Sequence, residues 1–92
     1  MPVLHRVGRA QVAMNYNDHN PPHVHPYLKG HGRSRMEIRT GEFQGSLPPR
    51  VEREVREWVL DNQALLLECW EDMLQGRPLR ALVSGGVKRG RQ

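Results

Sequence analysis

Apolar and polar residues alternate through the first half of the chain, as they do in strands that bury one face. Glycine, asparagine and proline interrupt the alternation and predict turns, with a longer loop over residues 17–22. The expected strands cover residues 3–7, 10–16, 23–29, 33–40 and 43–47. Pro26 has no amide hydrogen to donate, which predicts that its strand lies at the edge of the sheet or is bulged there.

A helical pattern replaces the alternation in the second half of the chain. Pro48-Pro49 suits the first turn of a helix, and Gly76 and Pro78 predict its end. Asp61-Asn62 could cap a second helix, so one long helix and two abutting helices both fit. Apolar residues recur at spacings of three and four in a stripe formed by Val51, Val55, Trp58, Val59, Leu65, Leu66, Cys69, Trp70 and Met73.

These elements predict an α+β fold. A small antiparallel sheet of four to five strands would pack against a long C-terminal helix or two abutting helices. The chain has 92 residues, 37% of them hydrophobic, which suits one compact domain, expected over residues 1–82. Residues 83–92 are rich in glycine and basic side chains and predict a flexible basic tail.

Charge is distributed unevenly along the chain. The net charge is +4 and the isoelectric point is about 10.0. Residues 1–50 hold seven basic and three acidic side chains, residues 51–75 two and seven, and residues 76–92 five and none. Because the excess comes from the C-terminal end, the high isoelectric point is weak evidence for nucleic-acid binding. A basic sheet segment facing RNA or an acidic partner is the narrower expectation.

Several classes of protein are excluded. No apolar run approaches the roughly 18 residues that a membrane span needs, and the N-terminus lacks the apolar region of a secretory signal. The single cysteine, Cys69, cannot form an internal disulfide, and its place in the helical stripe predicts an inert buried thiol. We therefore expect a cytoplasmic protein without a membrane segment.

Candidate chemistry is concentrated in the run Asn17-Asp18-His19-Asn20-Pro21-Pro22-His23-Val24-His25. His23 and His25 are two residues apart, so in a strand their side chains point to the same face. Asp18 or His19, with His31 as a further candidate, could add a third ligand to zinc or another divalent transition metal. A small metal-dependent hydrolase or nuclease would then use Asp18, His19, His23 and His25.

Metal-free acid–base chemistry is an alternative, with His19, His23 and His25 as candidate catalytic residues, because histidine exchanges protons near neutral pH. The polar sides of residues 23–29 and 33–40 would share the open face of the sheet. That face would carry cations suited to RNA or another phosphate, namely Lys29, Arg33, Arg35 and Arg39.

A purely structural interpretation of the same run stays open beside these two. The side chains of Asp18 and Asn20 would close turns in the loop. His23 and His25 would hydrogen-bond loop carbonyl groups and hold the hairpin.

The same run resembles the domain-of-unknown-function 4160 family of short bacterial proteins. Further similarity lies in Met1-Pro2, Leu47-Pro48, Glu57-Trp58, Glu68-Cys69-Trp70-Glu71 and residues 76–80, so that the resemblance covers about residues 1–82. This family has no settled activity. Its genes often stand beside those of the domain-of-unknown-function 2442 family, which implies a toxin–antitoxin-like pair and a small partner protein of that second family.

Three functions follow from these observations, and whether the protein is an enzyme is left open. The first is an accessory component of a toxin–antitoxin-like module, acting on a partner protein or RNA through a face bearing His23, His25, Arg33 and Arg35. The second is the metal-dependent hydrolase or nuclease. The third is a non-catalytic interaction domain that forms a homodimer, since a small sheet leaves an exposed edge.

Overall fold

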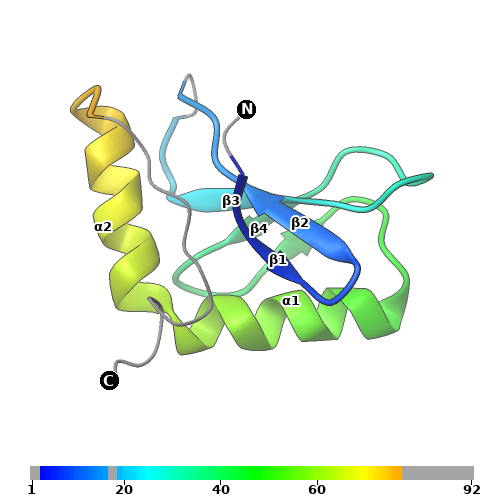
Figure 1. The fold of residues 1–92 in the computed structure, drawn as a ribbon. Helices are drawn as coiled ribbons and strands as arrows, with labels where there is room; N and C mark the ends of the chain where they lie inside the picture. Colours follow the sequence, from blue (N-terminus) through cyan, green and yellow to red (C-terminus); the bar gives the residue numbers. More distant parts are fainter. Residues whose placement is uncertain (1–2, 17–18, 78–92) are drawn as a thin grey trace.

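The chain folds into a sheet and two helices, and the computed structural model describes residues 3–16 and 19–77 (Figure 1). The elements are β1 (Val3–Val7), β2 (Ala10–Ala13), β3 (His23–Tyr27), β4 (Arg35–Glu37), β5 (Phe43–Gln44), α1 (Pro49–Asp61) and α2 (Gln63–Leu74). The strands form one antiparallel sheet in the order β1-β2-β3-β4-β5. This confirms the predicted α+β class. The predicted tail and residues 78–82 lie outside the described residues.

The hydrophobic core lies between one face of the sheet and the helices, with α1 beneath the sheet (Figure 1) and α2 adding Leu66, Cys69, Trp70 and Met73. α1 buries Val51, Val55 and Val59, which are four residues apart and therefore share one side of the helix. The sheet supplies alternate residues to the same core, including Val12, Val24 and Met36. The residues that alternate with these along each strand point to the opposite face of the sheet.

The helical segment is interrupted at Asn62, which answers the question that the sequence left open. The Asn62 backbone leaves helical geometry at ψ 28°, and its side-chain Nδ2 donates to the carbonyl of Trp58 at 2.8 Å. The Gln63 side-chain Nε2 donates to the carbonyls of Ile38 and Arg39 at 2.9 and 3.0 Å. These bonds fix the start of α2, which stands at one end of the sheet (Figure 1).

Pro26 lies in the central strand, so the expected edge position is wrong. Pro26 pairs with Val12 of β2 in unbroken register, and the register shift of the sheet lies instead in β1, between Val3 and His5. The ladder between β3 and β4 ends at Val24, before Pro26 is reached. A central strand tolerates this proline because its missing amide hydrogen falls beyond the end of the β3–β4 ladder, where a side chain supplies the donor instead, as described below.

The strands at this side of the sheet are shorter than the sequence predicted. β4 covers only three residues of the expected range 33–40, because the ladder stops where Pro26 would have to donate. β5 covers two residues before the close approach at Gly45 described below. In the part of the chain that is described, neither helix has the length and apolar character needed to cross a bilayer.

Candidate functional site

A groove of about 500 Å³ lies on the sheet face that α1 leaves open. It is lined by β3, by the start of β4 and the segment leading into it, by β5 and the residue after it, and by one residue that follows β2. We call it the sheet-face groove, and its lining residues are Asn15, His25, Pro26, Tyr27, Arg33, Ser34, Arg35, Gln44 and Gly45.

Strand register explains why polar side chains from distant parts of the chain meet in this groove. Ala13 pairs with His25, and Arg35 pairs with Gln44. Extending the register between β3 and β4 by one residue places His25 beside Arg35. Neighbouring strands lie about 4.8 Å apart, so His25, Arg35 and Gln44 form a row across the sheet. Ala13 ends this row with a small side chain.

His25 is held by a hydrogen bond that takes the place of a missing backbone bond. Ile38 N–H donates to the carbonyl of Pro22 at 3.0 Å, and hydrogen-bonded pairs alternate along an antiparallel ladder. Counting along the strands from Pro22 and Ile38, the next hydrogen-bonded pair is Val24 with Met36. The one after that would join Pro26 to Ser34, but proline has no amide hydrogen. Instead, His25 Nδ1 donates to the Ser34 carbonyl at 3.1 Å. The side chain next to the proline supplies the donor that the proline lacks.

Gly45, the residue after β5, lies very close to the backbone of the segment that leads into β4. Its φ of +143° favours glycine. A β-carbon there would lie 2.5 Å from the Cα and Oγ of Ser34 and 2.7 Å from the carbonyl oxygen of Arg33. Ser46 N–H donates to the same Ser34 hydroxyl at 3.2 Å. The groove wall therefore depends on a glycine at this position.

His23 lies beside the groove but is buried, with 4% of its surface exposed. Its ring centroid is 5.2 Å from that of Trp70 and 4.9 Å from that of His25, which it meets edge-on. Trp70 also donates its indole N–H to Asn20 Oδ1 at 2.9 Å. The C-terminal half of α2 thus covers His23. The Asn20 side chain bonds to α2, which the expected role in a local turn did not include.

Both histidines have their tautomer set by a backbone carbonyl. His23 Nδ1 donates to the Pro21 carbonyl at 2.8 Å, as His25 Nδ1 does to Ser34. Because a carbonyl oxygen only accepts, each Nδ1 carries the hydrogen and Nε2 is the acceptor atom of the neutral ring. These are the bonds to backbone carbonyls that the structural interpretation expects of the two residues. The same arrangement would also suit a base or a metal ligand, which act through Nε2.

The predicted metal site is not assembled by the described residues alone. Within residues 3–16 and 19–77, no three histidine, cysteine, aspartate or glutamate side chains are grouped so that they could hold a metal ion. His19 is exposed on the loop, and Asp18 lies outside the described residues. The metal site of Asp18, His19, His23 and His25 stays a prediction.

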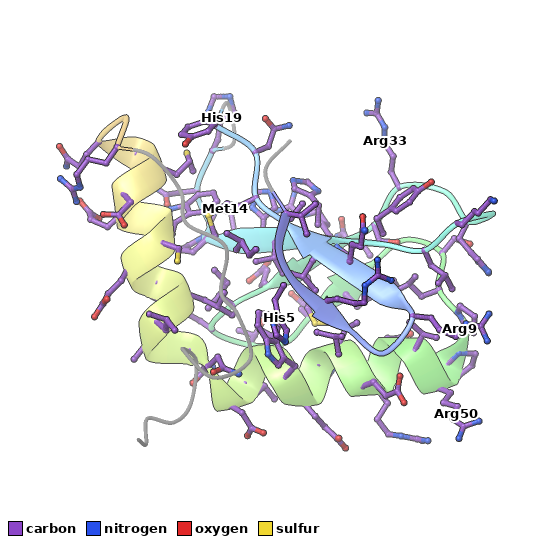
Figure 2. All side chains as sticks on the ribbon, in the orientation of Figure 1. His5, Arg9, Met14, His19, Arg33 and Arg50 are labelled. Carbon is purple, nitrogen blue, oxygen red and sulfur yellow. The ribbon has the colours of Figure 1, made fainter. Side chains whose placement is uncertain are left out.

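The predicted cationic residues separate into two groups. Arg33 and Arg35 line the sheet-face groove, whereas Lys29 and Arg39 are exposed elsewhere. In Figure 2, Arg33 projects from the β3–β4 connection, well apart from His19 on the loop near α2. His31 is half-buried in the turn between β3 and β4, where its backbone N–H donates to the Leu28 carbonyl.

Four lining residues were not singled out by the sequence: Asn15, Ser34, Gln44 and Gly45. Gln44 could have been assigned to this site only if the register of the β4–β5 hairpin, which pairs it with Arg35, had been known. Ser34 and Gly45 meet through backbone approach, for which the sequence offers only the presence of a glycine. Tyr27 lies two residues after His25 in β3, so strand alternation puts both side chains on one face, and both line the groove.

Comparison with known proteins identifies the family. A family model described as Domain of unknown function (DUF4160) matches residues 11–71. The match spans more than half of the chain, and the chain belongs to this family. The matched range includes the histidine run and most of both helices, but not residues 76–80. No curated protein and no solved structure matches the chain.

Proposed function

We propose that this protein binds RNA through the sheet-face groove, as an accessory component of a toxin–antitoxin-like module in the cytoplasm. The observation that supports this most directly is the convergence of Arg33, Arg35, His25 and Tyr27 on one groove. Arginine donates paired hydrogen bonds to phosphate oxygens, and an aromatic ring offers a face on which a base can stack.

RNA fits this groove better than an acidic protein surface does. Carboxylate recognition needs only the cations, whereas the groove also contains an exposed aromatic ring and the amide side chains of Asn15 and Gln44. Amides carry both donors and acceptors, which can pair with the edges of unstacked bases. Single-stranded RNA presents phosphates and base edges together.

The distribution of charge over the molecule favours the same end of the sheet. α2, at the opposite end from Arg33, contains Glu68, Glu71 and Asp72 and no basic residue. A polyanion is repelled from that end and attracted toward the arginines. An extended RNA would therefore approach with its backbone over the sheet-face groove.

The test compares two double variants that remove the same charge. Arg33→Ala with Arg35→Ala removes the groove cations, and Arg50→Ala with Arg53→Ala removes two exposed cations of α1. Fluorescence anisotropy with a short single-stranded RNA at one fixed salt concentration gives the affinity. We expect at least a tenfold loss for the groove variant and no more than about threefold for the control, an electrostatic effect common to both.

Two results would overturn the proposal. Equal losses for both double variants would mean that net charge, not the groove, governs binding. No measurable binding of RNA by the unmodified chain would instead favour the partner-protein alternative. The metal-dependent alternative is decided separately, by the metal content of the full chain purified without a histidine tag, because a functional site requires near-stoichiometric metal.

A further inference from the structure

We infer that the sheet-face groove is a site for a single nucleotide unit of single-stranded RNA, in which Tyr27 stacks on the base while Arg35 and His25 hold the phosphate. This inference rests on the proposed RNA binding and adds to it a division of labour within the groove. Tyr27 becomes the group that distinguishes a nucleic acid from any other polyanion.

Tyr27 has an unusual position for an aromatic residue of a central strand. It is 49% exposed, and at its position β3 is paired with β2 alone, because the ladder to β4 ends at Val24. Its strand neighbours Pro26 and Leu28 are buried on the α1 side, so the ring stands on the open face. An exposed ring on a sheet face adds nothing to the core, and sheet-based RNA-binding domains stack bases on rings in this position.

Distances along the sheet suit one nucleotide. Tyr27 and His25 are two residues apart on β3, which is about 7 Å, and Arg35 lies one strand further, about 5 Å away. A base and its own phosphate can therefore rest on Tyr27 and on the His25–Arg35 pair at once. The volume of about 500 Å³ is that of a small-molecule site and is too small for a duplex.

His25 can serve the phosphate without losing its place in the fold. Its Nδ1 is engaged with the Ser34 carbonyl, so any contact with a ligand has to be made through Nε2. A phosphate oxygen in the groove would accept charge-assisted hydrogen bonds from the Arg35 guanidinium and lie beside the His25 ring.

The experiment separates base stacking from phosphate binding with two ligands and three variants. The ligands are a short single-stranded RNA and inorganic polyphosphate, which has the charge but no bases. The variants are Tyr27→Ala, Tyr27→Phe and Arg35→Ala. Tyr16→Ala is the matched control, because Tyr16 is exposed to a similar extent (43%) but does not line the groove.

We expect Tyr27→Ala to weaken RNA binding roughly ten- to hundredfold, the range for loss of one stacked base. Tyr27→Phe keeps the ring face and should bind RNA within about twofold of the unmodified chain. Polyphosphate affinity should fall with Arg35→Ala and stay unchanged with Tyr27→Ala. Tyr16→Ala should alter neither ligand. Thermal melting of each variant confirms that the fold is retained.

The outcomes distinguish this inference from the function on which it rests. If Tyr27→Ala leaves RNA affinity unchanged while Arg35→Ala lowers it, the groove is a phosphate site without a base platform. The nucleotide site is then wrong, while RNA binding stands. If the unmodified chain binds neither ligand, RNA binding itself is wrong. Equal loss of RNA affinity in Tyr16→Ala and Tyr27→Ala would also reject a specific platform at Tyr27.

Discussion

At the scale of single residues, one proline determines how a catalytic or binding histidine would be held. Pro26 offers no amide to the carbonyl of Ser34, and the His25 ring donates to it instead. His25 is thereby both a structural donor and a lining residue of the sheet-face groove. A side chain held in this way enters binding with its ring already oriented, which lowers the entropy cost of contacting a ligand.

The first prediction at this scale concerns stability. His25→Ala removes the donor to the Ser34 carbonyl and should lower the free energy of unfolding by about 1–3 kcal/mol, the cost of an unsatisfied partly buried polar group. Adding Pro26→Val restores an amide at the position that faces Ser34. Urea denaturation should then show the double variant to be more stable than the sum of the two single changes predicts, by about 1 kcal/mol. Strict additivity would show that the two donors are not equivalent.

A second prediction at the same scale concerns the groove wall. Gly45→Ala places a β-carbon against backbone atoms of Ser34 and Arg33 and should destabilise the chain by about 1–3 kcal/mol or more. Gly32→Ala is the control, because a β-carbon there meets nothing within 4 Å. The measurement is the shift in melting temperature. A Gly45→Ala variant as stable as Gly32→Ala would contradict the close approach.

At the scale of elements, the break at Asn62 decides which residues reach the site. A single continuous helix would have left His23 on the open face beside His25, as strand alternation predicted. Because α2 begins anew at Gln63, Trp70 lies over His23 and buries it. Alternation reports which face a residue takes, but not whether a distant element covers that face. The strands, the helix pattern and the shared face of His25 and Tyr27 were predictable, whereas the burial of His23 was not.

The prediction for this scale concerns the attachment of α2. Gln63→Ala removes the two bonds to the carbonyls of Ile38 and Arg39 and should cost about 1–2 kcal/mol of unfolding free energy. Gln75→Ala is the control, since its side chain makes an exposed bond within α2, to Glu71. Urea denaturation of both variants checks the expectation. Equal stability of the two would mean that packing, not Gln63, positions α2.

At the scale of the whole molecule, charge separates into a cationic groove and an acidic α2, with further basic residues near the C-terminus. If the chain binds RNA as proposed, the high isoelectric point mixes two contributions to that binding. Groove arginines would act at one place on the ligand, and the C-terminal cations would add a general electrostatic attraction. The salt dependence of affinity reports their sum, because each neutralised phosphate releases counterions.

Charge neutralisation in the full chain separates these contributions. Lys88→Gln, Arg89→Gln and Arg91→Gln together should flatten the slope of log affinity against log salt while leaving the Tyr27→Ala effect unchanged. Each phosphate contact contributes about 0.7 to that slope for single-stranded nucleic acid. The measurement is an anisotropy titration at several salt concentrations. Loss of the Tyr27 effect in the neutralised chain would mean that the C-terminal residues, not the groove, place the RNA.

The short ladder between β3 and β4 has a mechanical consequence. Among the described residues, β3 is joined to β4 by the pairs His23–Glu37 and Val24–Met36, by the bond from Ile38 to Pro22 and by the bond from His25 to Ser34. A ligand held by Tyr27 on one side and by Arg35 on the other spans this seam. Its binding energy would then add to this short ladder, so that a bound ligand would stabilise the sheet at the seam.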